Sequence, residues 1–369
     1  MKVAIVCDWL TNVGGAERVL KAVHDMYPKA PIYTSKYDKK GIDWFLDADV
    51  RTGWLQIFPT CFRRILGPLR QIYFNHLDLS DYDAIISVTG AEAKSVKKGK
   101  AIHFCYCHVP TQYYWQFYDD YIKNPGFGFL NPLVRFFFRI LVNPLKKADY
   151  KSAQKPDYYI TISSYASELI KKYYNRESII IHPPVAVKDF HGKPTKRQTK
   201  QTYNFIVTSR QVNWKRIDLA IEACKKTKDN LTIVGTGPEH NSLVRLAGNY
   251  PLITFKPQMN QKGLKKEIEM SDGYIFPSFE PFGIAPVEAL AAGCPVIAYG
   301  KGGSLDYVEE GKNGIFFEKQ TANSLSKAIR KFKTIHFDAD KVMKSAEQFD
   351  EKIFTEKLRG YIYEKTRKN

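Results

Sequence analysis

The sequence has too few acidic residues to balance its basic ones. Its 369 residues include 56 lysines and arginines but only 38 aspartates and glutamates, which gives a formal net charge of +18 at pH 7. The rest of the composition, 44% hydrophobic and 25% charged, is ordinary for a soluble globular protein. The excess positive charge favours an anionic partner: nucleic acid, an acidic membrane surface or a phosphorylated substrate. A solvated basic surface without such a partner is the alternative.

The sequence also lacks long hydrophobic runs. No stretch approaches the roughly 20 apolar residues of a membrane-spanning helix. The amino terminus, MKVAIVCDWL, enters a strand directly and has neither the length nor the cleavage pattern of a signal peptide. No recognised nucleic-acid-binding module is present. We expect a cytoplasmic protein, peripheral at most on the inner face of the cell membrane, that does not bind nucleic acid.

Metal-binding patterns are missing as well. The six cysteines show no paired spacing of the zinc type. Cys105 and Cys107 alternate with aromatic residues in an expected strand, which predicts buried free thiols rather than ligands. No Asp-x-Asp stands at a suitable strand end. We therefore expect no metal and no bound cofactor.

Short apolar runs alternate with helical segments along the whole chain, which predicts an α/β protein with doubly wound parallel sheets. A polar, lysine-rich connector begins near residue 188 and divides the chain. We expect domains at 1–187 and 188–348, with a terminal helix at 349–369. The expected strands are Lys2–Cys7, Ala30–Ser35, Ala84–Thr89, Ile102–His108, Tyr158–Ser163, Ser178–His182, Asn204–Thr208, Leu231–Val234, Ile253–Lys256, Tyr274–Pro277, Pro295–Tyr299 and a last one within Gly311–Phe317.

The stretch Ser271–Gly303 is the most informative. It reads as strand, loop, helix and strand, with the helix beginning near Gly283 or Ile284. Backbone N–H groups at a helix start can hold a phosphate. Two carboxylates flank that point: Glu280 lies just before the helix and Glu288 lies more than one turn inside it. Because carboxylates repel phosphate, we expect these two to accept hydrogen bonds from hydroxyl groups instead. A ligand that carries both a phosphate and sugar hydroxyls fits this arrangement.

This stretch resembles the donor motif of retaining glycosyltransferases of family 4, which have the GT-B fold. The likeness rests on Glu280, Glu288, the string Phe282-Gly283-Ile284 between them and the following EALAAGCPVIA. It implies two Rossmann-like domains facing each other across a cleft, with a nucleotide-sugar donor on the second. Glu288 would then bind the ribose hydroxyls and Glu280 the hydroxyls of the donor sugar, with Phe282, Gly283 and Ile284 beside the phosphates.

Two further loops of the second half gain a role from this resemblance. Arg210 and Lys215 follow the strand Asn204–Thr208, and as a bare pair in so basic a chain they would be a surface feature. The resemblance makes them the clamp for the donor diphosphate, in place of a divalent metal. The turn with Gly235 and Gly237 also corresponds to a glycine turn of the family, on the donor side.

In the first half, Gly14 and Gly15 lie between the first strand and its helix, where glycine lets a ligand approach the backbone. A tight turn without a ligand is the alternative, since the GxGxxG pattern is absent.

His108 ends a strand, and as a lone residue it would be a structural histidine. Its segment, Cys105–Trp115, resembles mannosyltransferase-type members that build O-antigen and related polysaccharides. Those members usually have Thr-Pro and Met-Arg where this chain has Val109-Pro110 and Gln112-Tyr113. The resemblance places Gly14 and Gly15 near the donor phosphate and the acceptor, and His108 at the reacting sugar.

Two segments combine bulky apolar side chains with arginines. Trp54–Phe74 and Phe127–Lys147 are both too short to span a bilayer and too charged to be core alone. Basic helices with aromatic faces suit an anionic membrane surface. Amphipathic helices that pack inside the domain are the alternative.

We therefore predict a retaining hexosyltransferase. It would move a sugar, first of all mannose from GDP-mannose, to a saccharide or a polyprenyl-diphosphate-linked saccharide in cell-surface glycan synthesis. Two alternatives stay open: a sugar-nucleotide epimerase of similar fold, and a non-enzymatic basic protein that binds a membrane surface or nucleic acid.

Overall fold

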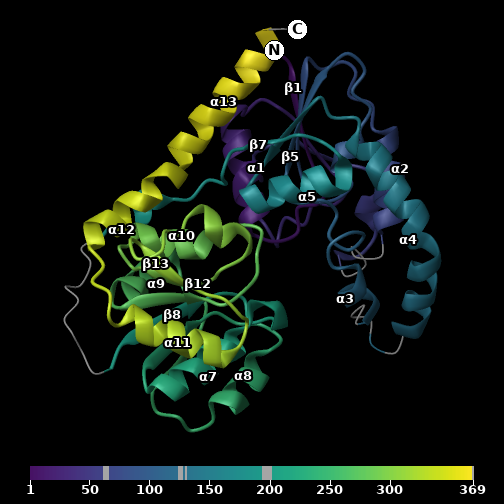
Figure 1. The fold of residues 1–369 in the computed structure, drawn as a ribbon. Coiled ribbons are helices and arrows are strands. Elements are labelled where there is room, and N and C mark those ends of the chain that lie inside the picture. Colours follow the sequence, from purple (N-terminus) through teal and green to yellow (C-terminus); the bar gives the residue numbers. More distant parts are fainter. Residues whose placement is uncertain (61–65, 124–127, 129–130, 193–201, 368–369) are drawn as a thin grey trace. The chain divides into compact units, whose positions relative to one another are not determined.

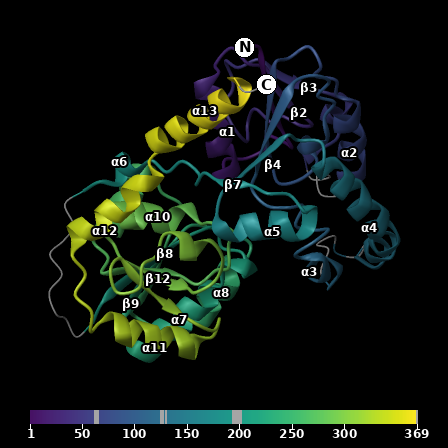
Figure 2. The same ribbon diagram turned by 45° about the horizontal axis from the view of Figure 1, so that its top comes forward.

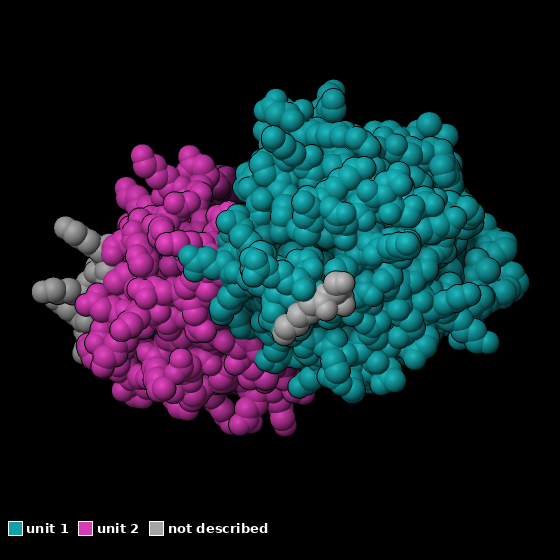
Figure 3. All heavy atoms as spheres, turned by 90° about the horizontal axis from the view of Figure 1, so that it is seen from above, with its two compact units in different colours: residues 1–184, 354–369 teal, residues 185–353 magenta. Residues whose placement is uncertain are grey.

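The computed structural model describes residues 1–60, 66–123, 128, 131–192 and 202–367. Within them the chain divides into two compact units. Unit 1 contains residues 1–184 and 354–369, and unit 2 contains residues 185–353 (Figure 3). The carboxyl-terminal stretch thus belongs by its contacts to the unit formed by the first half of the chain.

Unit 1 is built on a sheet whose strand order is β3-β2-β1-β4-β5-β6-β7 (Figures 1 and 2). Every neighbouring pair is parallel. The strands are β1 (Val3–Cys7), β2 (Ile32–Thr34), β3 (Val50–Thr52), β4 (Ala84–Thr89), β5 (Ile102–Cys107), β6 (Tyr158–Thr161) and β7 (Ile179–Ile180). β1 and β4 are buried along their whole length, which explains why their sequences are continuous apolar runs.

The helices of unit 1 connect these parallel strands. They are α1 (Gly15–Met26), α2 (Gly67–His76), α3 (Tyr118–Lys123), α4 (Asn131–Ala153) and α5 (Ser164–Tyr174), with the short turns η1 (Trp54–Ile57) and η3 (Ala93–Ser95). α5 begins where the Ser163 side chain accepts a hydrogen bond from the backbone N–H of Ala166. It ends at Asn175, which adopts the left-handed conformation.

The last helix, α13 (Glu351–Arg367), packs on unit 1 from Phe354 onward. The ring of Phe354 meets that of Tyr106 at 5.8 Å between centroids, and Tyr361 meets Phe104 at 6.3 Å and Tyr158 at 6.0 Å. Phe354, Leu358 and Ile362 are buried at helical spacing, so one stripe of α13 supplies the contact.

Unit 2 repeats the same plan with strand order β10-β9-β8-β11-β12-β13. Its pairs are also parallel. The strands are β8 (Asn204–Thr208), β9 (Asn230–Val234), β10 (Ile253–Lys256), β11 (Gly273–Phe276), β12 (Val296–Tyr299) and β13 (Gly314–Phe317). The helices are α6 (Val187–Phe190), α7 (Ile217–Thr227), α8 (His240–Ala247), α9 (Gln261–Glu269), α10 (Ile284–Ala291), α11 (Ala322–Phe332) and α12 (Ala339–Ala346), with turns η5 (Asn213–Lys215), η6 (Gly302–Asp306) and η7 (Glu347–Phe349).

The predicted doubly wound sheets are confirmed, and each sheet reverses its strand order at one place. In unit 1 the reversal lies between β1 and β4, and in unit 2 between β8 and β11. Ligands of such sheets bind outside the carboxyl ends of the strands at that reversal. The fold therefore points to two loop pairs, one in each unit.

The prediction missed one strand and misplaced some ends. β3 was not expected, because Val50–Thr52 is an edge strand that is half-buried to exposed and has no apolar run. The expected strands Ala30–Ser35 and Ser178–His182 shorten to β2 and β7. The five described cysteines, Cys7, Cys105, Cys107, Cys224 and Cys294, are buried thiols, as predicted for Cys105 and Cys107; Cys61 lies outside the described residues.

Candidate functional site

In unit 2, the loops after β8 and β11 meet at the strand reversal. The Nζ atom of Lys215, at the end of η5, lies 2.6 Å from Oε1 of Glu280. The same carboxylate oxygen accepts a hydrogen bond of 2.6 Å from the hydroxyl of Ser278, which is buried. Lys215 and Glu280 retain 22% and 20% of their side-chain exposure, so a ligand can reach both. The structure thus pairs the cation predicted for the diphosphate with the carboxylate predicted for the sugar.

Arg210 is exposed in the loop after β8, and the turn after β9 holds this loop in place. The backbone N–H of Gln211 donates to the carbonyl oxygen of Thr236, and the Gln211 side chain donates to that of Gly235. Gly235 has φ of +128°, and a Cβ there would lie 2.2 Å from the Ser209 carbonyl oxygen. The glycine turn therefore lets two backbones approach closely, and this contact positions the Arg210 loop.

Replacing Gly235 tests that positioning. Gly235→Ala is expected to displace Ser209 and Arg210, because the new methyl group overlaps the Ser209 carbonyl and L residues are strained at this φ. We expect a loss of stability of about 1–3 kcal/mol and a raised KM for the donor. Gly248→Ala is the matched control: its φ is +59°, but its Cβ would come no closer than 3.9 Å to another atom. Thermal unfolding and donor titration of both variants measure the effect.

The start of α10 offers backbone N–H groups beside this pair. Gly283 precedes the helix with φ of +98°, and Ile284 is its first residue. Phe282 is buried; its ring packs against those of Tyr307 and Phe349, and its carbonyl oxygen accepts a hydrogen bond of 3.1 Å from the Tyr307 hydroxyl. Phe282 therefore fixes the turn that leads into α10.

The loop after β12 supports the same turn. The backbone N–H of Gly303 donates to the carbonyl oxygen of Glu280 at 2.9 Å. A Cβ on Gly303 would lie 2.3 Å from Pro281 O, so only glycine allows this approach. The loops that follow β8, β11 and β12 thus meet at Glu280: the first contributes the Lys215 side chain, the second contains Glu280, and the third contributes the Gly303 N–H group.

Glu288 lies inside α10 and is 4% exposed. Burial raises the pKa of the Tyr274 phenol, hydrogen bonds with Thr208 oppose the shift, and the charges of Glu288 and Glu280 add to it. The Tyr274 hydroxyl lies 2.9 Å from the Thr208 hydroxyl, at the end of β8. The two predicted glutamates therefore act on one buried tyrosine at the strand reversal of unit 2.

In unit 1, the corresponding position is occupied by Asp8, directly after β1. Its carboxylate accepts hydrogen bonds from the Thr89 hydroxyl at 2.8 and 2.9 Å, from the Gly90 N–H at 3.0 Å and from the Ala93 N–H at 2.8 Å. Gly14 and Gly15 begin α1 in the same loop. A Cβ on Gly14 would lie 2.9 Å from Oε2 of Glu17, a buried residue of the first helical turn.

His108 follows β5, next to this cluster. The residue is partly buried, but its Nε2 atom is inaccessible and has no hydrogen-bond partner among the described residues. Burial lowers the pKa of His108 to about 4, although the charge of Asp8 opposes the shift. The imidazole is therefore neutral near pH 7, and its Nε2 atom is left without a hydrogen-bond partner in the described part of the structure.

The neutral histidines of unit 1 make its stability depend on pH. Burial lowers the pKa of His103 to about 3 and that of His108 to about 4, from 6.5. The unfolded chain therefore takes up these protons first as pH falls below 6.5, and stability is lost between about pH 6.5 and pH 4 by up to about 1.4 kcal/mol per pH unit for each group. The free energy of unfolding, measured with urea at several pH values in this range, should fall less steeply with decreasing pH in His103→Gln than in the parent protein. An unchanged dependence on pH would contradict the assignment to His103.

Sequence reasoning missed a buried ionic cluster around the unit 1 loops. Arg70 of α2 pairs with Glu92 at 2.9 Å, and Lys94 pairs with Asp149 of α4 at 2.6 Å. All four side chains are at most 3% exposed. Tyr113 joins the first pair by donating its hydroxyl to Glu92. The partners lie far apart in the sequence, so no local pattern indicates them.

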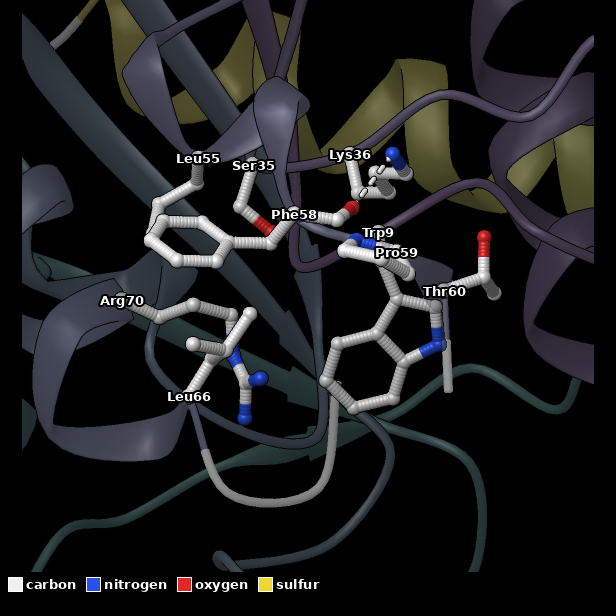
Figure 4. A pocket seen from close by; sticks show the side chains of 9 residues that line it. All are labelled: Trp9, Ser35, Lys36, Leu55, Phe58, Pro59, Thr60, Leu66 and Arg70. Atoms are coloured by element: carbon white, nitrogen blue, oxygen red, sulfur yellow. Dashed lines mark hydrogen bonds between the residues drawn. The ribbon is translucent and has the colours of Figure 1, made fainter. Parts of the chain in front are cut away.

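Arg70 also lines a small pocket (Figure 4). Its guanidinium carbon lies 4.8 Å from the centre of the Trp9 ring. Lys36, on the pocket wall, donates hydrogen bonds of 2.7 Å to the carbonyl oxygens of Gln56 and Phe58. The other lining residues are Ser35, Leu55, Pro59, Thr60 and Leu66. Within Trp54–Phe74, Arg70 and Phe74 are buried, which agrees for these two residues with the alternative of a helix that packs inside the domain. Residues 61–65 of that segment lie outside the described residues.

No group of three or more His, Cys, Asp or Glu side chains in the described ranges could hold a metal ion. Of the two cations predicted for the diphosphate, Lys215 is paired with Glu280 and Arg210 is exposed.

The two units, each built on a doubly wound parallel sheet, have the architecture of the GT-B fold. Residues 189–352 match the family model described as glycosyl transferases group 1, so unit 2 carries that domain. The chain is similar to the alpha-1,3/1,6-mannosyltransferase alg2 of Schizosaccharomyces pombe, with 25% identity over 82% of this chain and 68% of the relative. The Dictyostelium discoideum enzyme of the same description is 24% identical over 86% and 87%. The predicted resemblance to mannosyltransferase-type glycosyltransferases is confirmed.

Solved structures show the same fold. The lipopolysaccharide outer core galactosyltransferase WaaB superposes with a TM-score of 0.72 at 16% identity, covering 99% of this chain and all of the other. HepE of Anabaena, in complex with UDP, superposes with a TM-score of 0.71 at 18% identity, covering 99% and 100%. At such identities the superpositions establish the fold.

Proposed function

We propose that the protein is a retaining glycosyltransferase that uses a nucleotide-sugar donor, first of all GDP-mannose. The observation that carries the proposal is the group of Lys215, Glu280 and the start of α10 at the strand reversal of unit 2. Similarity to two enzymes described as mannosyltransferases favours mannose. UDP sugars are the second candidate, because HepE binds UDP and UDP-glucose.

In this proposal the donor lies on unit 2. Arg210 and Lys215 bind the diphosphate, and backbone N–H groups near Gly283 and Ile284 assist. Glu288 accepts hydrogen bonds from the ribose, and Glu280 from the donor sugar. Lys215 must then contact both Glu280 and the diphosphate, or exchange one for the other. Donor binding therefore rearranges the Lys215–Glu280 ion pair.

The proposed reaction leaves the anomeric configuration unchanged. The bond between the sugar C1 and the diphosphate oxygen breaks, and the acceptor hydroxyl forms the new bond to C1 on the same face. The departing diphosphate oxygen takes the acceptor proton, so no protein nucleophile is needed. Arg210 and Lys215 stabilise the negative charge that develops on the leaving group. His108 donates a hydrogen bond to a sugar hydroxyl through its neutral imidazole.

The proposed acceptor binds unit 1, near Gly14, Gly15 and His108. It is a saccharide or a polyprenyl-diphosphate-linked saccharide, used in cell-surface glycan synthesis. With a lipid-linked acceptor, the proposed location is the cytoplasm, peripheral on the inner face of the cell membrane. Transfer independent of metal ions is part of the proposal, because the two basic side chains replace a divalent cation.

The test is to incubate the protein with GDP-mannose or UDP-glucose, with and without polyprenyl-diphosphate-linked oligosaccharides, in the presence of a chelator. We expect an elongated acceptor whose new linkage keeps the α configuration of the donor by NMR. A product with the opposite configuration contradicts retention, and loss of transfer on chelation contradicts metal independence. Release of a rearranged sugar without acceptor would favour the epimerase instead.

A further inference from the structure

The outward side of α4 is apolar. Five large hydrophobic residues of its amino-terminal half are exposed: Leu133 by 55%, Phe136 by 59%, Phe137 by 51%, Ile140 by 56% and Leu141 by 43%. At 100° per residue these positions fall on one side of the helix, which we call the apolar face of α4. A helix on the surface of a soluble domain normally turns such residues inward.

The inward side of α4 is already fully engaged. Val142, Asp149, Ser152 and Ala153 are buried. Asp149 pairs with Lys94, and its other oxygen accepts hydrogen bonds from the Trp115 indole at 2.7 Å and the Tyr174 hydroxyl at 2.9 Å. Ser152 accepts a hydrogen bond of 2.9 Å from the side chain of Gln71 on α2. These contacts fix the rotation of the helix, so the apolar face cannot turn into the core of unit 1.

The charges that α4 itself exposes have one sign. Arg139, Lys147 and Lys151 are exposed on α4. Asp149 is the one acidic residue within Asn131–Ala153, and it is buried against Lys94. A partner that covers the apolar face therefore contacts exposed basic side chains of α4 and no exposed acidic side chain of that helix. This favours an anionic partner and disfavours a second copy of the chain, which carries the same formal charge of +18.

Neighbouring elements of unit 1 add to the exposed apolar surface. α2 lies beside α4 (Figures 1 and 2), where the bond from Gln71 to Ser152 joins them. Ile72 on α2 is 49% exposed, and Trp54 and Ile57 on η1 are 47% and 79% exposed. No described helix is both long and apolar enough to cross a bilayer. The geometry suits a helix that lies in the membrane interface with lysine and arginine beside it.

We propose that the apolar face of α4 docks unit 1 onto an anionic lipid bilayer. Phe136, Phe137 and Ile140 enter the boundary between headgroups and acyl chains, while Arg139, Lys147 and Lys151 contact the anionic headgroups. The inference rests on the proposed function in one respect: a lipid-linked acceptor would lie in the same bilayer. The apolar face of α4 would then hold unit 1, which binds the proposed acceptor, at that bilayer.

The experiment is co-sedimentation of the full chain with vesicles of phosphatidylcholine, alone or mixed equally with phosphatidylglycerol, without donor or acceptor. We expect binding to the mixed vesicles only. The double variant Phe136→Ser/Phe137→Ser should weaken it by about tenfold or more, because each phenylalanine withdraws a large apolar area from water. Lys147→Gln/Lys151→Gln should weaken it too, with a smaller dependence on salt.

The matched control is Val244→Ser/Met270→Ser, which removes two exposed apolar side chains from unit 2 and should bind like the parent protein. Nucleotide titration of each variant reports donor binding separately, so a failed docking surface is distinguished from a failed donor site. Equal binding to both vesicle types, or no binding to either, overturns the proposal. So does a dimer in light scattering that Phe136→Ser/Phe137→Ser converts to monomer.

Discussion

Lys215→Ala is expected to lower kcat/KM for sugar transfer by about 10²–10³-fold, because it removes a cation from the departing diphosphate. Folding should be little affected. The Lys215–Glu280 pair is partly exposed, at 22% and 20%, and such pairs contribute at most about 1 kcal/mol. Activity at saturating donor, compared with thermal unfolding, separates the two effects.

Lys256→Ala provides the control within the same unit. Lys256 pairs with Glu267 at the same distance of 2.6 Å and with similar exposure, 32% and 15%, but it lies on the edge strand β10. We expect its activity to stay near that of the parent protein. If both variants, or neither, lose transfer, the site assignment at the reversal between β8 and β11 is wrong.

Lys94→Met is expected to destabilise unit 1 by about 3–5 kcal/mol, the cost of leaving a buried charge without its partner. Lys94 and Asp149 are 1% and 0% exposed and lie 2.6 Å apart. Asp149 keeps hydrogen bonds from Thr111, Trp115 and Tyr174, but none of these donors carries a positive charge. Hydrogen exchange of the β4 and β5 amides under native conditions measures the stability of unit 1 by itself.

Two further variants make this result interpretable. Lys98→Met breaks a pair of the same length, 2.6 Å, but with 30% and 33% exposure, so we expect a loss of about 1 kcal/mol or less. Lys94→Met/Asp149→Asn removes both charges and should recover part of the stability lost in Lys94→Met. A loss in Lys98→Met as large as in Lys94→Met would show that burial of the charge is not the cause.

The sequence predicted the sheets well because parallel strands buried on both faces are continuous apolar runs, as in Val3–Cys7 and Ala84–Thr89. It also predicted which strand ends matter. Lys215 and Glu280 are 65 positions apart, yet the rule that ligands bind at strand ends places both loops at one edge. Their direct ion pair was not foreseen, because a pattern of residue types carries no side-chain geometry.

The buried charges of unit 1 show what local reasoning cannot supply. Asp149 and Lys94 are 55 positions apart, and Arg70 and Glu92 are 22 apart. Arg70 stands among apolar and basic residues, a composition that suits both a membrane-facing helix and a helix packed inside the domain.

Isothermal titration of GDP, UDP and ADP into the protein tests whether unit 2 binds a nucleotide-sugar donor through Lys215 and the loops around Glu280. We predict that GDP binds most tightly and that Lys215→Ala weakens this binding while Lys256→Ala does not. Tighter binding of UDP would keep the site and change the donor. If none of the nucleotides binds, or if GDP binds the parent protein and the Lys215→Ala variant equally well, Lys215 and the loops around Glu280 are not the donor site.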